Sequence, residues 1–233
     1  MSRANRKAAA ERFRRNIAQS NALHRQYLND QQLLEDYDRF ATWQLGYLLA
    51  YFDDLYEQDG YYEALDFIMS DLAGVGIAGR DRDLERVAPV ITSMLPTRAL
   101  QTIAAAATMN ARVLQINIDI CRCLRVNNRL PEEITEAGYF EACRGATTFD
   151  DCAELTHLIV GLGRTLESLV EMPILGSLLR AMRGPAHAAG FGALQEFLET
   201  GYFTFRRIPD VDSFLRQIEG RMIGIFKRIF SKG

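Results

Sequence analysis

The chain has 233 residues, of which 48% are hydrophobic and 24% charged, and its formal net charge at pH 7 is -3. This length and composition are typical of a globular chain with a large core, and they predict one domain or one core with an appended helix. The negative charge argues against nucleic acid as a partner, because such affinity depends on cations meeting phosphates, and no apolar run approaches the roughly 20 residues of a membrane-spanning helix.

The amino end and the cysteine usage indicate a protein of the cytoplasm. The basic first residues lead into the polar run Asn16–Asn21 and not into an apolar signal core. Four irregularly spaced cysteines are too few for a disulfide framework in a chain of this size. We therefore expect reduced, mostly buried thiols; the cysteines are Cys121, Cys123, Cys143 and Cys152.

Apolar residues recur at three- and four-residue spacing along almost the whole chain, whereas alternating, strand-like runs are scarce. This period predicts an all-α fold: a single-domain helical bundle of about eight to ten helices with no sheet. The first helix, about residues 6–27, is mostly polar and basic, so we expect residues 1–28 to dock loosely on a bundle domain of residues 29–233. A longer helix follows over about residues 31–56, and a shorter one over about residues 61–72.

A glycine-rich segment comes after the shorter helix. Gly74–Gly79 matches G-x-G-x-x-G, in which backbone amides approach the pyrophosphate of a dinucleotide. That motif requires a preceding strand and an acid about 20 residues further on, whereas a helix precedes it here and residues 94–98 contain no acid. We interpret the segment as a loop between helices and expect no cofactor.

The helix after this loop begins with a cluster of alternating charges and ends at Pro96. Asp81 or Asp83 is expected to cap it. The cluster forms an ion-pair network, a docking surface or simply a solvated helix start. Its candidate interaction residues are Arg80, Asp81, Arg82 and Asp83.

The longest helix is predicted from Thr97 to about Val126. Its apolar residues spread around more than one face, which places it near the centre of the bundle. Asn110 and Asn117 lie on it, and buried polar groups need partners. These two side chains therefore either line a ligand cavity or bond to neighbouring helices.

Pro131 and Thr148 mark the predicted starts of two further helices. On the second, Glu154 and His157 have the Glu-x-x-His spacing of di-iron bundles, but the chain lacks the second copy that such a site requires. We therefore expect no metal site.

The carboxyl part begins with Met172–Ile208, which predicts two short helices joined at a small-residue corner where Gly184-Pro185 breaks the helix. The last helix opens at Asp212 or Ser213, and its apolar stripe must be covered. Docking into the bundle or a second subunit would cover it; peripheral contact with a membrane is the less favoured alternative, suggested by the basic residues of the tail. The candidate interaction residues here are Met222, Ile225, Phe226, Ile229 and Phe230.

Two parts of the chain resemble a known family. They are Phe67-Ile68-Met69-Ser70-Asp71-Leu72-Ala73-Gly74 with the run Arg80–Val90, and, later, Arg183–Ala186, Ala189–Phe191, Leu194–Glu199 and Gly201–Phe205. In order and spacing these segments resemble the bacterial FFLEELY-motif proteins over most of the chain beyond about Phe40. Ser70 and Ala73 depart from the eponymous motif, which has an acid and a tyrosine there. The resemblance implies a bacterial helical protein and no particular reaction.

Two functional hypotheses follow. The first is a cytoplasmic interaction or scaffold protein that self-associates or docks a partner protein through its amphipathic, basic terminal helices. The alternative is a helical pocket protein that binds an apolar small molecule or cofactor. We assign no enzymatic activity, since no nucleophile, base and orienting group can be assembled from the motifs. The pocket candidates are Asn110, Asn117, His157, Tyr202, Phe203 and Phe205.

Overall fold

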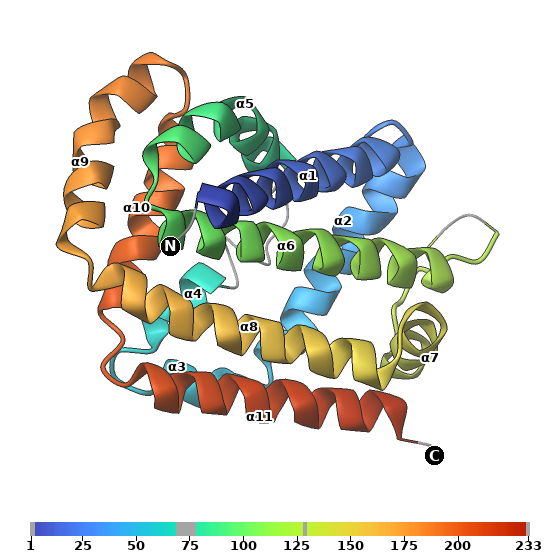
Figure 1. Cartoon of the computed structure of the whole chain (residues 1–233). Coiled ribbons are helices and arrows are strands. Elements are labelled where there is room, and N and C mark those ends of the chain that lie inside the picture. Colours follow the sequence, from blue (N-terminus) through green and yellow to red (C-terminus); the bar gives the residue numbers. More distant parts are fainter. Residues whose placement is uncertain (1–2, 69–77, 128–129, 232–233) are drawn as a thin grey trace.

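The computed structural model describes residues 3–68, 78–127 and 130–231. Within these ranges the chain forms helices and no strand (Figure 1), so the all-α, single-domain prediction is confirmed for this part. Eleven helices are present here, not eight to ten: α1 Arg3–Leu28, α2 Gln31–Leu49, α3 Asp53–Tyr56, α4 Tyr62–Phe67, α5 Ala78–Met94, α6 Thr97–Leu124, α7 Glu136–Ala146, α8 Phe149–Val170, α9 Pro173–Ala188, α10 Gly192–Arg206 and α11 Val211–Phe230.

Helix α6 is the centre of the bundle, as its apolar distribution predicts. Helices α1, α2, α7 and α8 all contact it, and α1 lies along much of its length (Figure 1). The close approach of α1 depends on small residues, because Ala104 and Ala107 of α6 are buried against Phe13 and Ile17 of α1. Side chains that fit at this density give a rigid contact.

The first helix is therefore an integral part of the bundle and not a loosely docked appendage. Phe13 and Ile17 are each only 2% exposed. On its polar side, Arg6 donates hydrogen bonds to the carbonyl oxygens of Thr92, Ser93 and Leu95 at 2.6 to 2.8 Å. These carbonyls close α5, where a cation is favoured by the helix dipole. Arg6 belongs to the basic segment for which a solvated face was predicted, and its hydrogen bonds instead hold α1 against the end of α5.

A second layer, α8 with α11, lies beside α6 (Figure 1). The two helices approach closely at Gly163 of α8, which lies directly against the Leu215 side chain of α11. Helices α9 and α10 pack on one another at one end of the molecule, and α7 contacts α6 and α11 at the other. Each layer buries its apolar stripe against the next, which is the usual way in which amphipathic helices form a core.

Two helix boundaries differ from the sequence-based expectation, and a third confirms it. The predicted helix over residues 31–56 ends at Leu49, and the chain turns so that Phe52 and Leu55 of the following short helix enter the core. Pro131 is not at a helix start, because α7 begins only after Thr135, whose hydroxyl oxygen caps the amide of Gly138. The Thr148 cap of α8 is confirmed.

The corner between α9 and α10 also lies further along the chain than predicted. Pro185 is inside α9, which continues to Ala188. The helix ends where Gly190 adopts a φ of 80°. The amide of Phe191 then returns to the carbonyl of Ala186 at 2.8 Å, the hydrogen bond of a glycine-terminated helix. Pro185 lies in the last turns of α9 and does not end the helix, because it removes one backbone hydrogen bond and the others remain. The left-handed conformation of Gly190 ends it.

Candidate functional site

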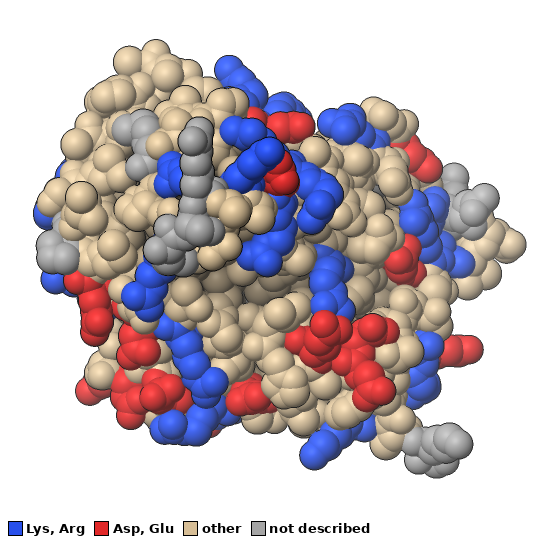
Figure 2. Space-filling view, viewed as in Figure 1, with Lys and Arg blue, Asp and Glu red and all other residues tan. Residues whose placement is uncertain are grey.

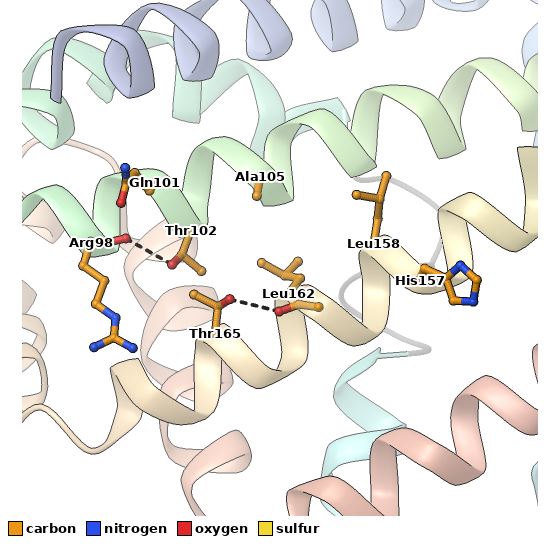
Figure 3. A pocket seen from close by; sticks show the side chains of 9 residues that line it. Arg98, Gln101, Thr102, Ala105, His157, Leu158, Leu162 and Thr165 are labelled. Atoms are coloured by element: carbon orange, nitrogen blue, oxygen red, sulfur yellow. Dashed lines mark hydrogen bonds between the residues drawn. The ribbon is translucent and has the colours of Figure 1, made fainter. Parts of the chain in front are cut away.

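A groove lies between α6 and α8 in the described part of the molecule (Figure 3). Its volume is about 570 Å³, within the range of small-molecule sites. The two helices run antiparallel there, so Arg98 of α6 lies near Thr165 of α8, and Ala105 lies near Leu158. The lining residues are Arg98, Gln101, Thr102, Ala105, His157, Leu158, Gly161, Leu162 and Thr165.

The middle of the groove is apolar even though it contains two threonines. The Thr102 hydroxyl donates to the Arg98 carbonyl oxygen at 3.1 Å, and the Thr165 hydroxyl donates to the Gly161 carbonyl oxygen at 2.9 Å. Each hydroxyl proton is therefore used within its own helix. Leu158 contributes an apolar side chain that is 40% exposed.

Glycine keeps the groove wide at its centre. A Cβ atom added at Gly161 would meet nothing within 4 Å, so the space in front of this residue is open. Glycine in a helix interior is less favourable than alanine by about 1 kcal/mol. Because Gly161 lines the groove, a larger side chain at this position would enter the open space.

The two ends of the groove differ in charge. Arg98 is exposed at one end, and within the described residues no carboxylate forms an ion pair with it. Arg12 of α1 donates to the carbonyl oxygen of Gln101 at 3.4 Å, which brings a second cation close to that end. At the other end, Nε2 of His157 lies 3.5 Å from a carboxylate oxygen of Glu219.

Figure 2 shows the same polarity over a wider area. Arginine and lysine side chains gather along the α1 side of the hollow, and acidic side chains gather toward the α8 amino-terminal half. Arg112 is bound there to Glu154 at 3.1 Å. A negatively charged group is therefore favoured at the Arg98 end and disfavoured at the His157 end.

Of the pocket residues predicted from sequence, only His157 lines this groove. Asn117 accepts a hydrogen bond from Gln44 at 3.4 Å. The Tyr202 hydroxyl donates to the Val170 carbonyl oxygen at 3.0 Å, so this buried ring is structural. The remaining aromatic candidates, Phe203 and Phe205, pack against the apolar cluster around Tyr202.

Asn110 belongs instead to a buried polar cluster between α1, α5 and α6. Its amide donates to Oδ2 of Asp81 at 2.8 Å and to the hydroxyl oxygen of Ser20 at 3.3 Å. Nε2 of His24 lies 3.0 Å from the same Asp81 oxygen, and Asn21 donates to the Asp81 carbonyl oxygen at 3.1 Å. Ser20, His24 and Asp81 are at most 2% exposed, so the cluster serves to fix three helices together and presents no surface.

This burial corrects the predicted docking surface at the start of α5. Asp81 has no exposed surface, because its carboxylate is needed by the cluster. Arg82 is exposed, and Asp83 forms an ion pair with Arg86 at 3.4 Å. The side chain of Arg80 lies outside the described residues, as do residues 74–77 of the glycine-rich segment and most of the FFLEELY-like segment.

The predicted interaction stripe of α11 is covered within the chain. Ile225 and Ile229 are 2% and 1% exposed, and Met222 and Phe226 pack against the main core cluster. Phe230 makes an edge-to-face contact with Phe149, with ring centroids 6.4 Å apart. The stripe therefore docks into the bundle, which is one of the alternatives that its pattern left open.

The predicted metal pair and two of the buried cysteines have the following surroundings in the described structure. Glu154 and His157 bond to different partners, and the described residues contain no cluster of three or more potential ligands. Burial raises the pKa of Cys121 and of Cys143 to about 12, which keeps these thiols protonated. Among the described helices, none combines the length and the apolar character that crossing a membrane requires.

The comparisons with known proteins give a family and no activity. Residues 23–233 match the family described as a domain of unknown function, DUF8198. Because the match covers most of the sequence, the chain belongs to this family. A search of the curated proteins and a search of the solved structures found no match.

Proposed function

We propose that this protein is a small-molecule binding protein that holds an apolar ligand in the groove between α6 and α8. The observation that carries the proposal is a hollow of about 570 Å³ with an apolar middle and few polar groups at its ends. Binding sites for small molecules have this composition, in which apolar walls supply affinity and a few polar groups fix orientation. His157 is the residue that the sequence already suggested for such a pocket.

The groove supports binding better than catalysis. Its ionisable lining residues are Arg98 and His157, which lie at opposite ends. A nucleophile with an adjacent base would be needed for covalent chemistry, and the described lining residues supply none. The interaction hypothesis has less support from α11, because the buried part of its apolar stripe is not available to a partner.

The second candidate function is docking of a partner protein in the same groove. The apolar lining extends over about two helical turns on each wall, and an amphipathic helix presents anchors over a similar length.

In either case we propose a cytoplasmic location, supported by the buried free thiols, and a bacterial origin, supported by the resemblance to FFLEELY-motif proteins.

Filling the groove tests the proposal. Gly161→Leu places a side chain in open space, and it improves helix propensity, so the variant is expected to fold. Gly224→Leu is the matched control, because this exposed glycine of α11 also has nothing within 4 Å of an added Cβ atom. The assay titrates each protein with the neutral fluorescent probe N-phenyl-1-naphthylamine.

We expect the natural protein and Gly224→Leu to enhance the fluorescence of the probe, and Gly161→Leu to lose the enhancement. Equal binding to all three proteins would place the probe elsewhere and would contradict the proposal. Native mass spectrometry of the purified proteins gives a second readout. Extra non-covalent mass that is present in the natural protein and absent from Gly161→Leu supports a small ligand, whereas a second protein lost in the same way supports partner docking.

A further inference from the structure

The arginine at one end of the groove is one of the described arginines that form no ion pair with a carboxylate, whereas other arginines of this protein are paired. Arg112, Arg183, Arg207 and Arg221 each form an ion pair with a carboxylate at 3.1 Å or less. Arg98 is exposed at the end of the groove, and no carboxylate of the described residues lies within ion-pair distance of it. Its guanidinium can therefore bind an oxyanion through two parallel hydrogen bonds.

A second cation reinforces this end. Arg12 donates to the carbonyl of Gln101, which lies one helical turn after Arg98 on α6. The acidic residue Glu219 is at the opposite end, beside His157. An anionic group would be attracted to one end and repelled from the other, so the charges define a single orientation for an elongated ligand.

The walls between these ends suit an alkyl chain. They run from Arg98 to Ala105 on α6, a rise of about 10 Å. Apart from the imidazole at the far end, the lining contains no aromatic ring on which a base or another flat ring system could stack. Leucine side chains and methyl groups instead offer the non-directional surface that saturated chains fill.

We propose that the groove binds an aliphatic chain of medium length that ends in an oxyanion, with the anionic group at Arg98 and the chain along Ala105, Leu158 and Leu162 toward His157. The inference rests on the proposed function and adds the chemical class of the ligand. A carboxylate and a phosphate monoester share the chemistry that Arg98 recognises, and the two are separated by the test.

The test compares decanoate, decyl phosphate, decanol and decylamine by isothermal titration calorimetry below their micelle-forming concentrations. The full chain is used as the natural protein and as Arg98→Gln, Arg216→Gln and Gly161→Leu. Arg216 is an exposed arginine of α11 outside the groove, so Arg216→Gln controls for the loss of one positive charge. Arg98 is exposed, so its replacement is expected to leave the fold intact, which far-ultraviolet circular dichroism checks.

We expect the natural protein to bind one or both anionic ligands at least about tenfold more tightly than decanol, and decylamine least well. Arg98→Gln should lower the affinity for the anions about tenfold and leave decanol unchanged, while Arg216→Gln should change neither. The better of the two anions identifies the head group. Equal affinities for decanol and both anions, or no effect of Arg98→Gln, would overturn the inference.

The two proposals fail in distinguishable ways. If decanol and the anions bind equally and Gly161→Leu abolishes both, the groove binds apolar ligands and only the inferred anion site is wrong. If neither the ten-carbon ligands nor N-phenyl-1-naphthylamine binds in a way that Gly161→Leu blocks, the proposed function is wrong, and this inference is refuted with it.

Discussion

Replacing Gly161 or Gly163 of α8 by alanine is expected to change stability differently, and the comparison tests how α8 and α11 pack. A Cβ atom at Gly163 would lie 2.5 Å from Cδ2, 2.9 Å from Cδ1 and 3.3 Å from Cγ of Leu215. Leu215 is 4% exposed, so its side chain has no solvent-filled space into which it could rotate. At Gly161, two residues earlier, an added Cβ atom would meet nothing within 4 Å.

The expected free energies follow from these distances. Both glycine-to-alanine changes gain about 1 kcal/mol of helix propensity. Gly163→Ala also overpacks the interface, which costs about 1 to 3 kcal/mol. We therefore expect Gly161→Ala to be stabilised by up to about 1 kcal/mol, and Gly163→Ala to be less stable than Gly161→Ala by about 1 to 3 kcal/mol. Because both changes are the same chemically, this difference isolates the clash.

Urea unfolding monitored by circular dichroism measures the free energy of unfolding of both variants. In thermal unfolding, a difference of 1 kcal/mol corresponds to about 2 to 4 °C in Tm for a domain of this size. In a double-mutant cycle, Leu215→Ala should relieve much of the cost at Gly163. Equal stability of Gly161→Ala and Gly163→Ala would refute the reasoning. It would mean that α11 is not held against α8, and the stripe of α11 would again be a candidate intermolecular surface.

Three further predictions concern ionisable groups. Asp81→Ala should cost about 2 to 5 kcal/mol in urea unfolding, because the buried His24 ring and the half-buried Asn110 amide lose their hydrogen-bond partner; a loss below about 0.5 kcal/mol would contradict the role of the polar cluster. Hydrogen bonds from Arg183 hold the pKa of Glu199 below its ordinary value, so this contribution is present above that ordinary value and is lost as the pH falls through the lowered pKa. Since Arg183 is exposed, solvent screens the pair and the contribution is small, and Glu199→Gln should flatten the acid side of the stability profile; an unchanged profile would argue against the pair. In a thiol-modification assay of the folded protein at pH 8, the exposed Cys123 should react rapidly, while Cys121, with a pKa raised to about 12, should react only on unfolding, and equal rates would be inconsistent with this packing.

The positions of the buried polar groups were the least accessible to prediction. Asp81 and Asp83 are both acids at the start of α5, and the sequence treats them as equivalent capping candidates. The structure buries Asp81 with His24 and leaves Asp83 in an ion pair at the surface. The Asp83–Arg86 pair lies within α5 at a spacing of three residues, whereas the His24–Asp81 pair is set by how α5 crosses α1. Helical spacing within one segment contains no information on that crossing.

The candidate site was predicted in part for the same reason. His157 was identified, but Arg98 and Leu158 were not, because a groove belongs to two helices and each wall looks like an ordinary helix face by itself. Tyr202 and Phe205 were expected in a pocket and are part of the core. Aromatic residues supply core volume more often than they line ligand sites, and only the packing shows which of the two applies.

Three properties of this protein could be predicted from its sequence: it is all helical, α6 is central, and the stripe of α11 has to be covered. These properties follow from periodicity and composition, which act within a segment. Three other properties appear only when the helices are packed: α11 covers its stripe against α8 and α7, α1 packs along α6, and α6 and α8 leave a groove with one cationic end. The physical reason is that apolar burial drives helices together without specifying partners, whereas the partners are selected by the close fit of particular residues such as Gly163 with Leu215.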